Sequence, residues 1–274
     1  MGTFRKARAD APAGFFETEA AGLRWLDVVG GPRVARVLGT GPTHLDLERI
    51  GSAAPTRAAA RDLGRRLATM HDAGAPAFGV LAPGARRGFF GPLDDPLVLV
   101  DGAFDDWPTF YAQARLRPVV EQGRDRGVLD RDDAAAVDAV CARLGALAGP
   151  AEPPSRLHGD LWSGNVMWTR AAAPDAGGSA GDDGGDEPDG VAAVLVDPAA
   201  HGGHREADLA MLALFGAPHL EVILAAYDET HPLAPGWRDR VDLHQLYPLA
   251  VHAVLFGGGY VDQVRRLLES LAHR

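Results

Sequence analysis

The 274-residue sequence has only one cysteine, Cys141, so the chain cannot form an internal disulfide bond. A single free cysteine fits a reducing compartment, and we expect a cytoplasmic protein. The sequence also lacks a run of about 18 apolar residues, the length that crosses a bilayer as a helix. Its first residues have no apolar core of the kind found in secretory signals. We therefore expect neither disulfide cross-linking nor a membrane span.

Positive charge is scarce. The formal net charge is −10, which argues against a nucleic-acid or anionic-membrane partner. Much of this charge comes from residues 171–190, a segment with several acidic residues and no basic one. Its Gly- and Asp-rich composition predicts a flexible acidic insertion between two strands. Because 46% of the residues are hydrophobic, the rest of the chain can bury a sizeable core. Nothing in the sequence indicates an oligomeric state, and a monomer is the default.

Lysine is almost absent as well. Lys6 is the only lysine among 27 basic residues, and all the others are arginines. Lysine presents a compact point charge, whereas arginine presents a planar fork. A lysine retained in such an arginine-rich chain is a candidate for a site that needs an ammonium group. The alternative is chance survival near the start of the chain.

Several common catalytic patterns are missing. No His/Cys cluster has zinc-binding spacing, and no Gly-x-Ser-x-Gly elbow is present. The glycines at 257–259 do not form the Gly-x-Gly-x-x-Gly pattern of a dinucleotide site. We interpret His71, at the end of an expected helix, as a packing or capping residue. These absences argue against zinc, elbow-type serine and dinucleotide chemistry.

The chain is expected to begin with a small unit that combines strands and a helix. Residues 3–9 are expected to form a strand, and the apolar spacing of residues 15–29 predicts a helix that Gly30-Gly31-Pro32 ends. Residues 34–38 and 45–50 are expected to form two strands. The first 50 residues therefore predict a β–α–β–β unit, which we treat as an N-terminal lobe.

The remaining residues, 51–274, predict a larger and mainly helical lobe. Helices are expected at 56–73, 106–121 and 131–147, and again throughout most of the chain after residue 208. Residues 74–100 are rich in Gly and Pro and predict loops. Short apolar strands are expected at 166–168 and 191–196. The predicted class is α+β with two lobes.

The most informative stretch runs from His158 to Asn165, with the sequence HGDLWSGN. It places the carboxylate of Asp160 and the carboxamide of Asn165 five positions apart on a short loop. A second acid, Asp197, follows the apolar run at 194–196. One base and two oxygen ligands for Mg²⁺, delivered by two loops, are what phosphoryl transfer from ATP requires. A single aspartate in a loop is usually a turn residue, but the flanking strands favour the catalytic interpretation.

Two further residues complete this set. Lys6 is the candidate contact to the phosphates of ATP, and Glu19 is the acid that would hold the ammonium in place. Glu19 falls on the predicted helix that follows the first strand, so it can face Lys6. Glu17 lies only two residues away, and an exposed surface acid is the alternative interpretation of Glu19.

The His158–Asn165 stretch resembles the signature of the fructosamine kinases, also called ketosamine kinases. The related aminoglycoside and choline kinases commonly have His-Pro where this chain has Trp162-Ser163. The resemblance continues through residues 197–199, 203–211 and 246–258, and it covers nearly the whole chain from Lys6 onward. It implies a two-lobed protein-kinase-like fold, the cofactors ATP and Mg²⁺, and phosphorylation of a sugar hydroxyl on a ketoamine. The implied substrates are fructosamine, ribulosamine or erythrulosamine adducts of amines or proteins, and the implied role is deglycation repair.

The resemblance also implies a role for each matching residue. Asp160 takes the position of the base, Asn165 and Asp197 those of the metal ligands, and Lys6 and Glu19 those of the paired lysine and glutamate. Residues 45–50, with Glu48 at their centre, fall where the family's hinge contacts adenine through its backbone. Near the sugar pocket the resemblance places three residues whose individual roles stay open: Trp162, His204 and Glu206. Asp208 is expected to brace the catalytic loop, residues 158–165, through hydrogen bonds.

The chain departs from the family pattern in two places. Relatives have two strands and a glycine-rich loop before the lysine, whereas only five residues precede Lys6 here. A start placed too late is one explanation, and an inactive truncated pseudokinase is the alternative. His201-Gly202 replaces aromatic residues of many relatives, which leaves the preferred substrate open. A kinase of aminoglycosides or other small molecules is the second functional alternative.

Overall fold

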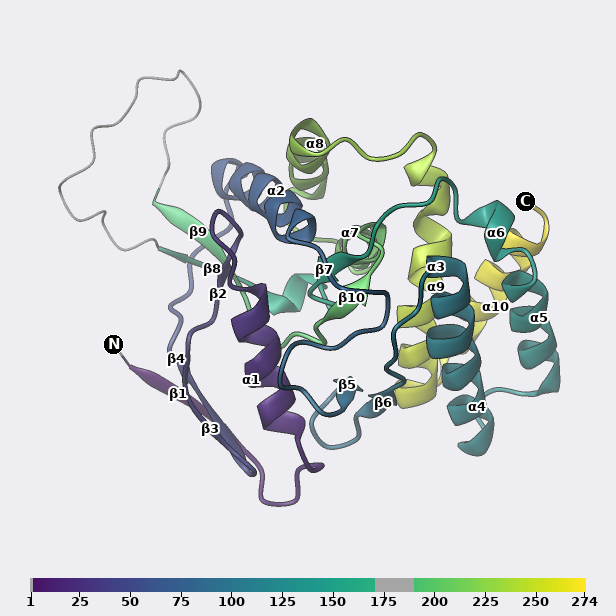
Figure 1. Cartoon of the computed structure of the whole chain (residues 1–274), viewed down its shortest axis with the longest axis horizontal. Helices are drawn as coiled ribbons and strands as arrows, with labels where there is room; N and C mark the ends of the chain where they lie inside the picture. The colour runs from purple at the N-terminus through teal and green to yellow at the C-terminus, as the bar shows by residue number, and fades with distance from the viewer. Residues whose placement is uncertain (1, 171–189) are drawn as a thin grey trace.

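The computed structural model describes residues 2–170 and 190–274. Except for Gly190, the predicted acidic insertion lies outside the described residues. A small sheet flanked by one helix lies at one end of the molecule, and a group of helices fills the other end (Figure 1). Helices and sheets are mixed as the predicted α+β class requires. None of the helices in the described ranges is long and apolar enough to span a membrane.

The N-terminal β–α–β–β unit is present. Strand β1 (Thr3–Ala7) pairs antiparallel with β4 (His44–Glu48), and β4 pairs with β3 (Val37–Gly41). Helix α1 (Phe15–Leu26) buries its apolar face against this part of the molecule. Lys6 pairs with Leu45 across the β1–β4 ladder, which fixes the position of its side chain on the sheet.

The strand predicted at 34–38 is divided in two. Its first part belongs to β2 (Arg33–Val34), which pairs in parallel with β9 (Val191–Leu195), whereas β3 joins the N-terminal sheet. Strand β9 also pairs antiparallel with β8 (Val166–Arg170). The split arises because the partner of β2 comes from far along the chain, which local apolar spacing cannot indicate. Through β2, the first 50 residues are hydrogen-bonded directly to the strands beside the catalytic loop.

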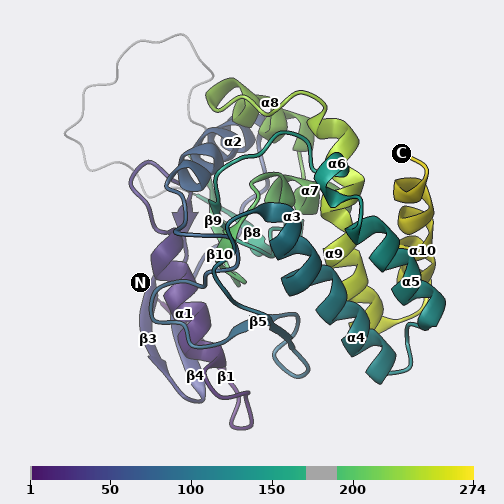
Figure 2. The same cartoon turned by 45° about the vertical axis from the view of Figure 1, so that its right-hand side comes forward.

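Helix α2 (Arg57–Asp72) begins where the Thr56 side chain accepts a hydrogen bond from the backbone N–H of Ala59 at 3.1 Å. It packs closely against α8 (Leu220–Thr230), and both views show the two helices side by side (Figures 1 and 2). Gly64 makes this packing possible, since a Cβ at that position would lie 2.2 Å from the carbonyl oxygen of Ile223.

The middle of the chain differs in detail from the prediction. A short hairpin of β5 (Gly88–Phe90) and β6 (Leu97–Leu99) occupies part of the region expected to be loop. The helix expected at 106–121 consists of α3 (Trp107–Phe110), a π-helical turn η1 (Tyr111–Leu116) and α4 (Arg117–Asp125). The helix expected at 131–147 breaks into α5 (Arg131–Cys141) and α6 (Leu144–Leu147).

The remaining elements surround the catalytic loop. Strands β7 (Ser155–Leu157) and β10 (His201–Gly203) form an antiparallel pair, and a single helical turn η2 (Ser163–Asn165) precedes β8. Three further helices follow along the chain: α7 (Glu206–Leu214), α9 (Trp237–Phe256) and α10 (Gly259–Ala272). Figure 2 shows α4, α5, α9 and α10 gathered on the side opposite the N-terminal sheet.

Buried apolar side chains form two clusters. The first joins α1 and the N-terminal strands to α2, α8, β8 and β9. The second joins η1, α4 and α5 to α9 and α10. The catalytic loop contributes Leu161 to the first cluster, while Ala199, just beyond Asp197, belongs to the second. The site therefore lies where the two cores meet.

Candidate active site

The catalytic loop, residues 158–165, runs from β7 to η2 and β8. Gly159 has a φ of +81°, and a Cβ there would lie 2.3 Å from the carbonyl oxygen of Ala199, so a glycine is required. The turn brings Asp160 and Asn165 together. The Asn165 Nδ2 group donates to the backbone oxygen of Asp160 at 2.8 Å and to its Oδ2 at 3.1 Å. The five-residue spacing of the sequence thus becomes a direct contact between the two side chains.

Asp208 supports this loop through hydrogen bonds, as expected. Its buried carboxylate accepts hydrogen bonds from the backbone N–H groups of His158 at 2.7 Å and Gly159 at 2.9 Å. His71 Nε2 lies 3.2 Å from the same carboxylate, and His71 Nδ1 lies 2.7 Å from the hydroxyl of Tyr227. Burial alone would raise the pKa of Asp208, but these hydrogen bonds and the nearby histidines hold it below its ordinary value. His71, predicted to be a packing or capping residue, is buried within this network.

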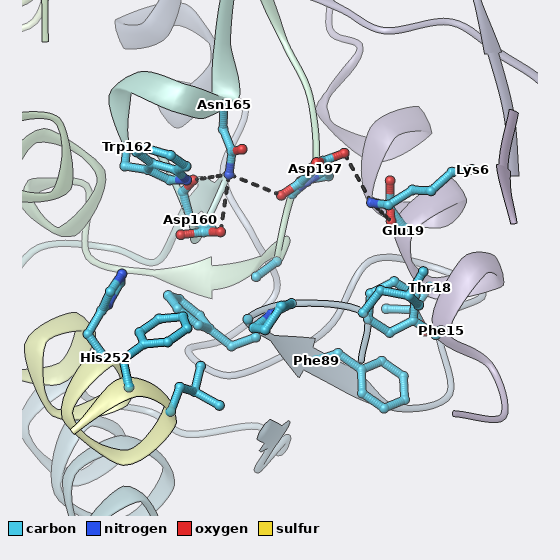
Figure 3. Close-up of a pocket in the computed structure, with 18 residues that line it drawn as sticks. Lys6, Phe15, Thr18, Glu19, Phe89, Asp160, Trp162, Asn165, Asp197 and His252 are labelled. Carbon is cyan, nitrogen blue, oxygen red and sulfur yellow. Dashed lines mark hydrogen bonds and ion pairs between the residues drawn. The ribbon is translucent and has the colours of Figure 1, made fainter. Parts of the chain in front are cut away.

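Asp197 follows β9 in a left-handed conformation, with a φ of 53°. Its Oδ1 lies 3.2 Å from Lys6 Nζ, and Lys6 Nζ donates to Glu19 Oε2 at 2.8 Å (Figure 3). Burial opposes the charge on Lys6, but the two carboxylates outweigh it and raise the lysine pKa. Strand β1, helix α1 and Asp197, beyond the distant strand β9, therefore meet at one ammonium group, and Glu19 is the partner of Lys6 rather than a surface acid.

Glu19 itself is only 5% exposed. Its Oε1 atom is buried and has no hydrogen-bond partner in the described part of the chain. Burial, opposed by Lys6, raises the pKa of Glu19 to about 7. The paired lysine keeps this carboxylate from being neutralised completely near physiological pH.

These side chains line one cavity of about 330 Å³, which we call the catalytic cavity. Asp160, Asn165 and Asp197 lie along one side with Lys6 and Glu19, and the opposite side is mainly apolar (Figure 3). The apolar side comes from residues 89–93 and from α9, with His252, Leu255 and Phe256. The polar side chains of the cavity therefore face an apolar surface that suits a partly apolar substrate.

Asp160 has the properties of a general base that works near neutral pH. Burial raises its pKa to about 7, and Asp197 and Asp208 act in the same direction, while the hydrogen bond from Asn165 opposes them. A base is most effective when its pKa lies near the operating pH. The side chain also points toward the catalytic cavity (Figure 3).

Asn165 and Asp197 offer the oxygen ligands that Mg²⁺ prefers. The amide nitrogen of Asn165 is directed at Asp160, which leaves its carbonyl oxygen without a hydrogen bond inside the described protein. Asp197 already attracts a cation, because the Lys6 ammonium lies against its carboxylate. This donor set fits a hard divalent ion held beside the phosphates of a nucleotide.

The structure places Glu48 away from the catalytic cavity. Its carboxylate accepts a hydrogen bond from Arg33 Nη2 at 2.8 Å and another from the backbone N–H of Arg36 at 3.2 Å. The side chain therefore serves the junction between β2 and β4. The expectation that this segment contacts adenine concerns its backbone, and it stays a prediction.

The three residues expected near the sugar pocket separate into two groups. Trp162 lines the catalytic cavity and is 39% exposed. His204 and Glu206 are buried elsewhere: Glu206 receives two hydrogen bonds from Arg240, at 2.5 and 2.9 Å, and His204 packs against Trp107. They do not line the catalytic cavity, because α7 begins at this point and turns them into the helical core.

Sequence reasoning gave no role to the apolar wall of the cavity. His252 and Phe256 are four positions apart on α9, so they share a helix face, and their rings lie 5.6 Å apart. Phe215 does not line the cavity but packs between two residues that do, with its ring 4.9 Å from that of His252 and 6.0 Å from that of Trp162. The i, i+4 spacing was a usable signal, but only the fold shows that this face meets the catalytic loop.

Comparison with a solved structure identifies the class of fold. The solved structure of choline kinase LicA from Streptococcus pneumoniae has the same fold, with a TM-score of 0.58 at 15% identity over 99% of this chain and 86% of that one. The fold is therefore of the protein-kinase-like class.

The family follows from closer matches. A model of the fructosamine kinase family matches residues 2–274. The chain is 43% identical to a "putative fructosamine-3-kinase" from Thermobifida fusca, whose crystal structure matches with a TM-score of 0.85 over 99% of this chain and 86% of that one. It is 32% identical to a "Probable ketoamine kinase" of Enterococcus faecium, over 97% of this chain and 86% of the relative. The chain belongs to the fructosamine kinase family, so the predicted fold and the predicted class of enzyme, a ketosamine kinase, are confirmed.

Proposed function

We propose that this protein transfers the γ-phosphoryl group of ATP, with Mg²⁺, to a sugar hydroxyl of ketoamines such as fructosamine, ribulosamine or erythrulosamine adducts. The observation that carries the proposal is the convergence of Asp160, Asn165, Asp197, Lys6 and Glu19 on one cavity. Family membership supports the substrate class. A phosphorylated ketoamine would shed its sugar, so the proposed role is the repair of glycated amines.

Asp160 orients the sugar hydroxyl and accepts its proton. The hydroxyl oxygen forms a bond to the γ-phosphorus as the bond between that phosphorus and the ADP oxygen breaks, and the proton ends on the Asp160 carboxylate. Lys6, held by Glu19, offsets negative charge on the phosphates. Asn165 and Asp197 would hold Mg²⁺, which when bound neutralises charge on the phosphate oxygens.

The apolar wall supports an amine-bearing substrate. A ketoamine carries a secondary ammonium next to its sugar, and aromatic faces attract such cations. Burial lowers the pKa of His252, whose Nδ1 donates to the backbone oxygen of Pro248 at 2.7 Å. The ring is therefore neutral, and the wall from Trp162 to Phe256 has no positive charge to repel the ammonium group.

Two alternatives remain distinct from this proposal. An aminoglycoside kinase is favoured by the acids of the cavity, because aminoglycosides are polycations, but the chain belongs to the fructosamine kinase family. An inactive pseudokinase is opposed by the complete set of base, metal ligands and lysine. Parallel assays with kanamycin and with a ketoamine of a lysine derivative discriminate these alternatives.

The decisive experiment replaces the base. Asp160→Asn should lower kcat for a ribulosamine or fructosamine substrate by about 10²–10⁴-fold, because the hydroxyl proton loses its acceptor. Binding of ATP, measured by calorimetry with Mg²⁺, should change by less than about threefold, since Asp160 is not a nucleotide contact. Asp138→Asn, at an exposed ion pair with Arg117, is the matched control and should keep full activity. Turnover retained by Asp160→Asn would refute the assignment of the base.

A further inference from the structure

A second cavity lies behind the catalytic loop and has no part in the reaction proposed above. Its volume is about 40 Å³, and Arg115, His201, His244 and Gly159 contribute to its lining. Gly159 immediately precedes Asp160, so only the loop backbone separates this cavity from the reaction centre. A cavity needs roughly 10–15 Å³ to hold one water molecule, so this one has room for a ligand of a few atoms.

Arg115 is a buried cation without an acidic partner. It is only 2% exposed, and its Nη1 donates to the backbone oxygens of Val100 at 3.0 Å and Ala114 at 2.8 Å. Within residues 2–170 and 190–274, its Nη2 is buried and has no hydrogen-bond partner, and no carboxylate forms an ion pair with it. Burial lowers the pKa of Arg115, and the more distant Asp101 opposes this effect. Arginine stays charged in proteins, and an uncompensated buried charge is strongly unfavourable.

Asp101 offsets this charge only from a distance, and the other neighbouring groups form no ion pair with it in the described part of the chain. His201 Nδ1 donates to the backbone oxygen of Ala199 at 2.8 Å, and burial lowers the His201 pKa to about 3, so its ring is neutral. His244 is buried, and its Nδ1 has no hydrogen-bond partner in the described structure. Asp208 also lines the cavity, but its carboxylate already accepts hydrogen bonds from the backbone N–H groups of His158 and Gly159. Glu206 lies outside the lining, is held by two hydrogen bonds from Arg240, and lies 3.2 Å from His244 Nε2.

The surrounding fold keeps Arg115 in place without a ligand. The Tyr111 hydroxyl donates to the backbone oxygen of Leu243 at 2.6 Å and accepts from the backbone N–H of Tyr247 at 3.1 Å, which ties η1 to α9. The Arg115 guanidinium lies 4.5 Å from the ring centre of Phe110 and 5.6 Å from that of Tyr247. These contacts hold the guanidinium beside the cavity, which Arg115 lines.

We propose that this cavity binds a small monovalent anion, either a halide or the carboxylate of a small acid, through Arg115 Nη2 and the His244 ring. The size of the cavity excludes a nucleotide or a ketoamine. The unpaired guanidinium supplies the attraction, and a histidine nitrogen can carry the proton that completes the site. The bound anion would neutralise a charge lying directly behind the catalytic loop.

The first test locates the anion. Crystals of the whole protein are soaked in sodium bromide, and anomalous scattering is measured at the bromine edge. A bromide peak within hydrogen-bond distance of Arg115 Nη2 is expected. A cavity without bromide, when peaks occur elsewhere on the molecule, would overturn the proposal.

The second test asks whether the anion stabilises the fold through Arg115. Chloride, and separately formate, replaces the bulky gluconate ion at constant ionic strength while Tm is measured. The wild type and the exposed control Arg117→Met should each rise by about 2–4 °C, and Arg115→Met should not respond. A response to chloride alone identifies a halide site, and a stronger response to formate identifies a carboxylate site.

The remaining outcomes are also informative. In gluconate, Arg115→Met should be at least as stable as the wild type, because it removes an unpaired buried charge while keeping most of the volume. Equal responses of all three proteins to chloride would show an adventitious ion only, even with a bromide peak, and would reject the site.

Discussion

At the scale of single residues, the site depends on carboxylates whose protonation is set by burial. Asp160 and Glu19 both have pKa values raised to about 7, whereas Asp208 is held ionised by hydrogen bonds. The base Asp160, the lysine partner Glu19 and the supporting Asp208 all carry a carboxyl group, and only the surroundings of that group differ. Their separate functions follow from what each one contacts.

The raised pKa of Asp160 predicts a pH dependence. The base is active when deprotonated, so kcat/KM should rise as the pH increases through about 7 and then level off. Deprotonation of Glu19 acts in the same direction, because the charged carboxylate holds Lys6. The measurement is kcat/KM for the ketoamine from pH 5.5 to 9 at constant ionic strength. A flat profile over this range would contradict the assignment, and Glu19→Gln should leave only the ionisation of Asp160.

The site residues could be predicted from the sequence where the signal was local. Asp160 and Asn165 share one short loop before a strand, Asp197 follows another strand, and the structure brings all three to one cavity. Lys6 and Glu19 were candidates because Lys6 is the only lysine and Glu19 falls on the helix that follows its strand. Nothing in their spacing requires contact, and the resemblance to a family supported the pairing. The positions of His204 and Glu206 could not be predicted, because the start of α7 decides which way they face.

At the scale of elements, close packing of α2 against α8 depends on a single missing side chain. Gly64→Ala should lower stability by about 2–3 kcal/mol, because the new Cβ would collide with the Ile223 carbonyl oxygen. Gly145→Ala on α6 is the matched control, since a Cβ there meets nothing within 4 Å. The control should be neutral or slightly stabilising. Thermal unfolding measures both, and equal Tm values would contradict the predicted clash.

The elements themselves were predictable to different degrees. Helix α2 carries a clear apolar face and a Thr56 cap, and its observed bounds lie within one residue of the expected ones. The π-helical turn in the predicted 106–121 helix could not be foreseen, because its residues fit an ordinary helix and its form is set by contacts with α9. The pairing of β2 with β9 joins segments too far apart for any local pattern.

At the scale of the whole molecule, the core does not follow a division at residue 50. The first hydrophobic cluster includes Phe16 and Leu47 from the N-terminal part together with Leu63, Val194 and Ile223 from the rest. The two predicted lobes thus share one interior. The N-terminal sheet is an extension of this core.

This shared core predicts which elements of the protein unfold together. In native-state hydrogen exchange, the amides of α1 and β2 should exchange through the same unfolding event as those of α2 and β9, with equal dependence on denaturant. The second cluster, around η1 and α9, provides the internal comparison. Exchange of α1 through a separate opening of lower free energy would mean that the first 50 residues form an independent unit.

The single lysine has a consequence for the chemistry that this enzyme is proposed to repair. Sugars form ketoamines on free amines, and Lys6 is the only side chain of the protein with such a group. That amine is held as an ammonium between Glu19 and Asp197, and its raised pKa makes it a poor nucleophile. The protein therefore offers a reducing sugar almost no lysine side chain to modify.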